Sequence, residues 1–255
     1  MRTLSLTLLI LASPLPAQSL ASRIAAMADE AVTFHFTARD GVCGDGQHFI
    51  RTGRHSYHGS WSAHRGMEPC TYGPIQVRLT VSGGAVSRVQ SWVGVLRTRD
   101  ARDLGAVPAA EAARYLMTLA ARGTPNVSAK AIMPAVLADS ATVWPALLDV
   151  ARDAETRSRS TRQEAMLWLS RYASGAIIGR RNDPLDIEWD RTEEDELKVH
   201  AVFVLSQLPN GSGIPQLLEV ARSSPNKRVR SQALFWLGQS SDPRALALFE
   251  SVLRS

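Results

Sequence analysis

Pro145-Ala-Leu-Leu-Asp-Val-Ala-Arg152 recurs later in the chain as Pro215-Gln-Leu-Leu-Glu-Val-Ala-Arg222. A second motif, Ala165-Met-Leu-Trp-Leu-Ser170, recurs as Ala233-Leu-Phe-Trp-Leu-Gly238, and Ala201-Val-Phe-Val-Leu-Ser206 lies between its two copies. Self-similar helical units are typical of stacked helix pairs, because a single pair cannot bury its apolar face alone. These motifs therefore predict that the carboxyl-terminal part of the chain is an all-α superhelical solenoid.

The periodicity of apolar residues supports the same prediction along the whole of residues 105–255. The spacing stays near 3.6, and Pro, Gly, Asn and Asp separate most of the apolar segments, as they do at helix ends. The solenoid is expected to contain about four helix pairs. The predicted helices span residues 108–122, 128–138, 142–152, 161–173, 192–207, 213–222, 227–238 and 243–254.

The last unit, Asn226 to Phe249, resembles a HEAT repeat. The matching residues are Val229, Arg230, Ala233, Leu237, Gly238, Asp242 and Pro243, together with the apolar spacing of the final helix. The resemblance covers roughly residues 107–255, although Ser174 to Asp190 interrupts the pattern with Gly, Arg, Asn, Asp and Pro. It implies helix pairs stacked into a curved superhelix whose concave side is lined by the second helix of each pair.

A helical projection of the second motif separates a buried side from an outer side. With about 100° per residue, Val229, Ala233, Trp236 and Leu237 fall on one stripe. Phe235 falls at the opposite side, where a solvated helix would carry charge.

Leu167 and Phe203 stand at the positions equivalent to Phe235. Two interpretations remain open: another part of the chain covers these residues, or they form an apolar stripe that receives a partner peptide or helix. For the second interpretation the partner-binding candidates are Leu167, Phe203, Phe235 and Arg162, one of the arginines that give the repeats a basic character.

The preceding part, residues 18–100, predicts a small antiparallel β domain. Val32–Thr37 and Ile75–Val81 alternate apolar and polar residues, as half-buried strands do. Ser82–Gly84 is a hairpin turn signal. The predicted fold class is therefore α+β, with this β domain followed by the solenoid.

Two further details define the β domain. In the returning strand, Val86 and Val89 fall on opposite faces, which predicts a bulge or twist near Arg88. The charged stretch from Arg97 to Asp103 ends the alternation, and we expect the domain boundary there.

The amino terminus predicts export. Residues 1–17 combine a short basic start, an apolar core too short to span a bilayer, and small residues before an expected cleavage near Ala17, as in a signal peptide. In an exported chain, Cys43 and Cys70 are expected to form a disulfide, although a metal pair is the alternative. The expected location is periplasmic or extracellular.

Charge and length limit the classes of partner. The formal net charge is +5 and is spread along the 255 residues, which argues against a dedicated nucleic-acid site. After the leader, no apolar run approaches the length of a membrane span. The expected partner is a protein or peptide, and the sequence leaves the oligomeric state open.

The residue types that carry catalysis or metal binding give no strong pattern. Five of the six histidines lie within residues 35–64, but the spacing of His55, His58, His64 and Cys70 matches no strong metal signature, so these histidines are weak metal candidates. No glycine-flanked serine elbow and no phosphate-binding loop is present, so no catalytic residue and no cofactor are predicted. The predicted function is an exported, non-enzymatic interaction scaffold. The alternative is a β domain that binds metal or acts on envelope material, with the solenoid as support.

Overall fold

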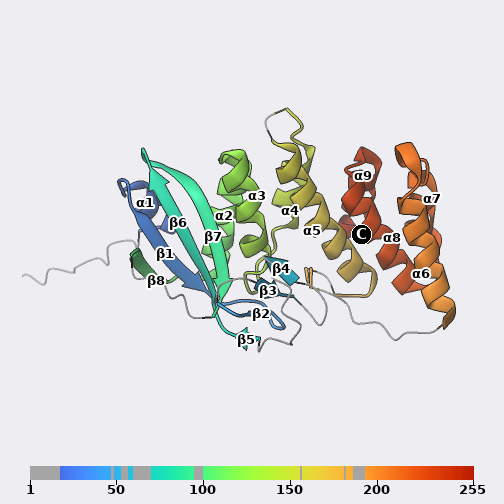
Figure 1. Cartoon of the computed structure of the whole chain (residues 1–255), viewed down its shortest axis with the longest axis horizontal. Coiled ribbons are helices and arrows are strands. Elements are labelled where there is room, and N and C mark those ends of the chain that lie inside the picture. The colour runs from blue at the N-terminus through green and yellow to red at the C-terminus, as the bar shows by residue number, and fades with distance from the viewer. Residues whose placement is uncertain are drawn as a thin grey trace, which may run out of the picture.

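The computed structural model describes residues 18–46, 49–52, 57–59, 70–94, 100–155, 157–180, 182–185 and 193–255. The larger of two sheets lies at one end of the molecule, the smaller sheet lies next to it below the first helix pairs, and a row of helices extends away from the larger sheet (Figure 1). The segment 1–17, with its predicted signal peptide, lies outside the described residues. Among the helices that are described, none is long and apolar enough to cross a membrane.

The larger sheet has the strand order β7-β6-β1-β8. Strand β1 pairs antiparallel with β6, and β6 with β7, but β1 and β8 are parallel. The prediction of an entirely antiparallel β domain was therefore wrong at one pair, because β8 returns to the sheet after a longer connection. The strands are β1 (Ala31–Phe36), β6 (Ile75–Ser82), β7 (Ala85–Val93) and β8 (Arg102–Ala106).

The hairpin between β6 and β7 confirms the predicted turn and the predicted bulge. Gly83 and Gly84 both have positive φ, 58° and 74°, as a tight primed turn requires. Thr80 pairs with Arg88 and Val81 with Val86, so Ser87 is the extra residue of the bulge.

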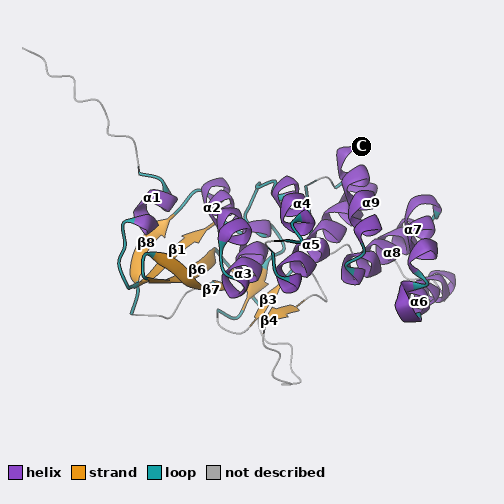
Figure 2. Ribbon diagram, turned by 90° about the horizontal axis from the view of Figure 1, so that it is seen from above, coloured by secondary structure: helices purple, strands orange, loops and turns teal. Residues whose placement is uncertain are grey.

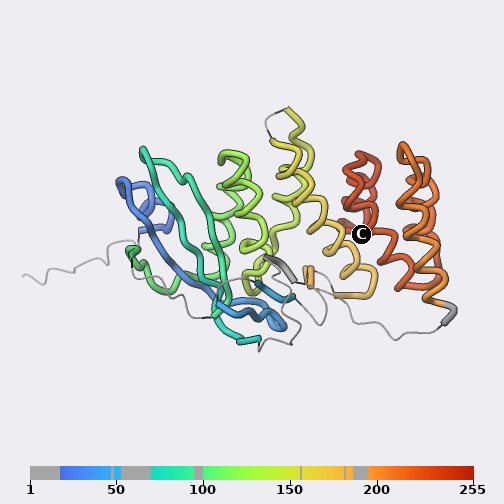
Figure 3. Tube along the Cα trace, viewed as in Figure 1, coloured from blue at the N-terminus to red at the C-terminus, as the bar shows by residue number. Residues whose placement is uncertain are grey.

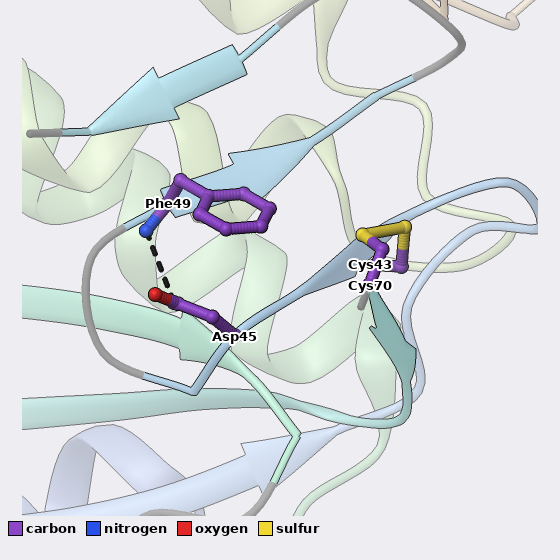
Figure 4. Close-up of a disulfide and its surroundings, with 4 residues drawn as sticks. All are labelled: Cys43, Asp45, Phe49 and Cys70. Carbon is purple, nitrogen blue, oxygen red and sulfur yellow. Dashed lines mark hydrogen bonds between the residues drawn. A yellow bond between two sulfur atoms is a disulfide. The ribbon is translucent and has the colours of Figure 1, made fainter. Parts of the chain in front are cut away.

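The smaller sheet is antiparallel, with the order β4-β3-β2-β5. Its strands are β2 (Cys43–Gly44), β3 (Phe49–Arg51), β4 (Tyr57–Gly59) and β5 (Thr71–Tyr72). The predicted disulfide between Cys43 and Cys70 is present, with the two Cα atoms 5.4 Å apart (Figure 4). In the adjoining β2–β3 connection, the backbone N–H of Phe49 donates to Asp45 at 3.2 Å (Figure 4).

The predicted helices are observed with small shifts at their ends. Side-chain caps fix several starts: Ser158 accepts from the N–H of Thr161 in α5, Asn226 from the first turn of α8, and Asp242 from the N–H of Arg244 in α9. The helices are α1 (Leu20–Ala25), α2 (Ala109–Arg122), α3 (Pro125–Val136), α4 (Trp144–Arg152), α5 (Arg159–Ile177), α6 (Glu193–Ser206), α7 (Ile214–Ser223), α8 (Lys227–Ser240) and α9 (Pro243–Arg254).

The helix pairs do not succeed one another in chain order. From the sheets outward, α2/α3 is followed by α4/α5, then by α9/α8, and α7/α6 lies at the far end (Figures 1 and 2). In Figure 3 the red carboxyl-terminal pair therefore lies between the yellow α4/α5 pair and the orange α6/α7 pair. Helix α8 consequently contacts α5, α6, α7 and α9.

The apolar core runs through both parts of the chain. Buried residues from Leu20 to Leu253 form one connected cluster, and α3 packs against β7. Strand β8 extends to Ala106, so the larger sheet continues past the predicted limit at residue 100. The division into an 18–100 domain and a 105–255 domain stays a prediction.

Candidate functional site

The candidate partner-binding residues lie on α5, α6 and α8. Arg162 and Leu167 belong to α5, and both side chains are half-buried. Phe235, on α8, is also half-buried, whereas Phe203 on α6 is 38% exposed. None of the four is fully buried, so intramolecular packing covers the expected stripe only in part.

The buried side of α8 is rotated from the predicted one. Val229, Ala233 and Leu237 are buried as expected, but Leu234 is fully buried and Trp236 is only half-buried. The projection placed Trp236 on the buried stripe, and it placed Leu234, at about 100° from Ala233, at the edge of that stripe. The reason is that α8 packs against helices on several sides, so its apolar stripe is wider than a single contact would make it.

Phe203 and Phe235 are linked through Trp236. The ring of Trp236 lies 5.3 Å from that of Phe203 and 5.1 Å from that of Phe235, measured between centroids, and His200 lies 6.0 Å from Phe203. We call His200, Phe203, Phe235 and Trp236 the aromatic cluster. Such tilted and edge-on pairs are favourable arrangements for aromatic rings.

Trp236 was predicted to lie on the buried stripe and not among the partner-binding candidates. Trp236 stands at the motif position of Trp168, and Trp168 is fully buried, so the motif gives both residues the same expected environment. The motif does not encode this difference, because the indole of Trp236 lies against Phe203 of α6, a side chain that is itself 38% exposed. His200 gave no signal beyond its position three residues before Phe203.

Several buried hydrogen-bond donors on α5 and α8 have no acceptor in the part of the chain that the structure describes. The Nε1 of Trp236 and the Nε atoms of Arg162 and Arg230 are buried, and none has a hydrogen-bond partner within the described part of the chain. By contrast, Trp168 donates its Nε1–H to Glu164 at 2.8 Å. Buried donors without acceptors are uncommon in native structures, and they concentrate here on α5 and α8.

Two polar contacts join α6 to α8 beside the cluster. Arg228 forms an ion pair with Glu196, with Nη2 and Oε1 2.7 Å apart, and Asn226 donates to Asp195. Arg230 donates from Nη1 to the carbonyl of Ser224 at 3.3 Å. These contacts position α6 so that Phe203 reaches Trp236.

A separate hollow of about 620 Å³ lies where β7, α3 and α5 meet. Arg88, Lys130 and Glu164 are its charged lining residues, and Glu164 also holds Trp168. Burial raises the pKa of Glu164, while the Trp168 hydrogen bond and the charges of Lys130 and Arg171 oppose that rise. No candidate from the sequence lies in this hollow.

The structure gives no support to a metal centre where it describes side chains. Among those residues, no group of three or more His, Cys, Asp or Glu is placed to hold an ion. Cys43 and Cys70 are joined in the disulfide, so they are not a metal pair. Of the weak candidates, His55 and His64 lie outside the described residues, and His58 is described only by its backbone in β4.

Comparison with known proteins identifies the carboxyl-terminal segment. Residues 229–255 match the family model of the PBS lyase HEAT-like repeat. These residues include most of α8 and all of α9. No curated protein and no solved structure matches the chain. The predicted resemblance is therefore confirmed: the carboxyl-terminal part of the chain contains a HEAT-like repeat.

Proposed function

We propose that this protein is an exported, non-enzymatic scaffold that binds a protein or peptide partner on the face formed by α5, α6 and α8. The observation that carries the proposal is the aromatic cluster, in which Phe203 is 38% exposed and Phe235 and Trp236 are half-buried. Aromatic side chains that present both a rigid apolar surface and a polar atom are enriched at the centres of protein interfaces.

The charge and hydrogen-bonding capacity of this face indicate what the partner offers. Arg162 and Arg230 are half-buried cations on α5 and α8. Their Nε–H groups without an acceptor are themselves buried, so a partner would meet the exposed remainder of each side chain. A partner segment with apolar side chains and carboxylate or carbonyl oxygens would match both features. The helix pairs serve as the rigid support, and we propose that they form the curved superhelix typical of HEAT-like repeats.

The test is capture of the partner by the folded protein with single substitutions on this face. Phe203→Ser should lower the amount of captured partner at least tenfold, because Phe203 is more exposed than Phe235 and Trp236, which are half-buried. Tyr72→Ser is the matched control: Tyr72 is 67% exposed but lies in β5, far along the chain from α6. Loss of the partner with both variants, or with neither, would count against this face.

A photo-reactive residue at Leu167 adds an independent readout. Leu167 is half-buried on α5, and a crosslink from it should reach the same partner that Phe203→Ser loses. Crosslinks to a different protein, or to none while capture by the native chain is intact, would contradict the proposal.

Export is supported by the leader-like residues 1–17 and by the disulfide, which persists in oxidising compartments. We propose that the leader is removed near Ala17 and that the mature protein is periplasmic or extracellular. Amino-terminal sequencing of the protein from the native cell, together with thiol labelling after fractionation, provides the test. An intact leader on a cytosolic protein with reduced Cys43 and Cys70 would refute export.

A further inference from the structure

Helix α6 is apolar on two opposite sides, although it lies at the far end of the helical row (Figure 2). One side faces α7 and α8, where Val202 is buried and Val199 and Leu205 are half-buried. The other side carries Leu197, which is 72% exposed, and Val204, which is 47% exposed. Lys198 is the only charged residue between Leu197 and Ser206 when His200 is neutral.

The neighbouring end helix shows the usual arrangement. Helix α7 buries Ile214, Leu217, Leu218 and Ala221 and turns Gln216 and Glu219 to solvent. A helix that closes a stack is expected to have such a polar outer face, because nothing packs beyond it. The outer face of α6 is therefore the exception, and it has the composition of an interface.

The exposed apolar residues form one narrow stripe. At about 100° per residue, Ala201 and Val204 fall within about 40° of Leu197. Ala201 is also exposed, and it lies between the two larger residues along the helix axis. We call Leu197, Ala201 and Val204 the α6 stripe. Phe203 lies on the flank toward Trp236, so the stripe is distinct from the aromatic cluster.

The stripe is complementary to itself under a two-fold rotation. If two α6 helices cross antiparallel near Ala201, Leu197 of each copy meets Val204 of the other, and the small alanines let the helices approach closely. A two-fold axis makes this contact isologous, as in most homodimers.

The charges of α6 select the antiparallel arrangement and a second copy of this chain. In this register the acidic residues Asp195 and Glu196 would lie opposite Ser206 and Leu205, which carry no charge. A parallel pair would instead place the two acidic turns against each other. A basic peptide is a weaker fit, because Asp195 and Glu196 are already engaged by Asn226 and Arg228.

We propose that the α6 stripe is a homodimer contact, formed by two copies of this chain around a two-fold axis near Ala201. A helix of 14 residues is about 21 Å long and about 10 Å wide, so the α6/α7 end offers a patch of roughly 21 by 20 Å. This is smaller than the ~800 Å² per partner of a standard interface. The dimer should therefore be in concentration-dependent equilibrium with the monomer, in the micromolar range.

Sedimentation velocity of the folded full chain, from about 1 to 300 μM, tests this proposal. The weight-average mass should rise from one chain toward two, and Leu197→Glu should weaken the association at least tenfold. Tyr72→Glu, at a comparably exposed residue in β5, should leave the association unchanged. A monomer at every concentration, or a dimer that Leu197→Glu does not weaken, would overturn the proposal.

A cysteine pair tests the geometry directly. Ala201→Cys should form an intermolecular disulfide under mild oxidation, because a two-fold axis near this residue brings the two copies within the 4.4–6.8 Å Cα separation of disulfides. Gln216→Cys, on the exposed side of α7, should form no intermolecular disulfide under the same conditions. Equal crosslinking by both variants, or none by Ala201→Cys, would reject the antiparallel contact.

Discussion

Replacing Gly238 by alanine tests the contact between α5 and α8. Through this contact the last helix pair packs on α5, although α6 and α7 follow α5 in the sequence. A Cβ added at Gly238 would lie 2.7 Å from both Cβ and Oγ of Ser170 and 3.1 Å from the carbonyl oxygen of Met166. Ser170 and Gly238 are the equivalent last residues of the two motif copies. One motif therefore supplies both sides of this contact, and small side chains on both sides allow the close approach.

Two effects of opposite sign decide the stability of Gly238→Ala. Alanine is favoured over glycine in a helix interior by about 1 kcal/mol. Overpacking a close contact costs about 1–3 kcal/mol, and the upper end applies because Cβ and a backbone carbonyl cannot move without separating the helices. We expect the variant to be less stable than the native protein by about 2 kcal/mol. Helix propensity alone would predict that Gly238→Ala is more stable than the native protein.

Urea unfolding followed by far-UV circular dichroism measures this difference. Gln239, the exposed next residue, supplies the reference: Gln239→Ala should exceed Gln239→Gly in stability by about 1 kcal/mol. Adding Ser170→Gly to Gly238→Ala should recover about 2 kcal/mol in a double-mutant cycle. Ser170→Ala should not, because it keeps the clashing Cβ. If Gly238→Ala is stabilising and uncoupled from Ser170, α5 and α8 do not pack as described.

Three further predictions follow from single side chains. Because burial raises the pKa of Glu164, the folded protein holds the carboxyl proton more tightly than the unfolded chain does, and the contribution of Glu164 to stability falls as pH rises above about 4.5. Glu164→Gln should therefore raise Tm more at pH 7 than at pH 4. An equal shift of Tm at both pH values would refute this. The hydrogen bond from Arg244 lowers the pKa of Asp242, the cap of α9, so the stabilisation that Asp242 provides is present near pH 7 and is lost as pH falls below the ordinary pKa of an aspartate. Asp242→Ala should lower the free energy of unfolding by about 1 kcal/mol at pH 7 and by less at pH 2, measured by urea unfolding. A cost that does not depend on pH would contradict the capping role. Replacing Cys43 and Cys70 by serine opens a closure of 27 residues and should cost about 3 kcal/mol in the same assay, with a much smaller loss arguing that the loop is held by other contacts.

The helices and the main hairpin could be predicted because their signals are local. The Asp242-Pro243 start fixes where α9 begins, and Gly83 and Gly84 fix the hairpin turn, without reference to the rest of the chain. The parallel pairing of β8 with β1 could not be predicted in this way, because Arg102–Ala106 shows no clear alternation and its partner lies far away in sequence. In the candidate site, too, the local motif positions could be predicted, and the contacts between helices could not. The motif placed Phe203 and Phe235 on equivalent outer positions, but only the packing of α6 against α8 brings Trp236 between them.

The irregular stretch after α5 accounts for the order of the helix pairs. Helix–helix connections in bundles usually need two to eight residues, whereas 15 residues, 178–192, separate α5 from α6. The start of this connector is held near α5: its backbone at Asp183 packs against Gly175, and Asn182 accepts the indole N–H of Trp144 at 3.1 Å. The α8/α9 pair lies between α5 and the α6/α7 pair, and each helix is about 10 Å wide, so the two ends of this connection lie far apart. A short connector would have placed α6 on α5. With the longer connection, the surface of α5 is not covered by α6. Helix α8 packs there instead, so the two copies of the motif contact each other.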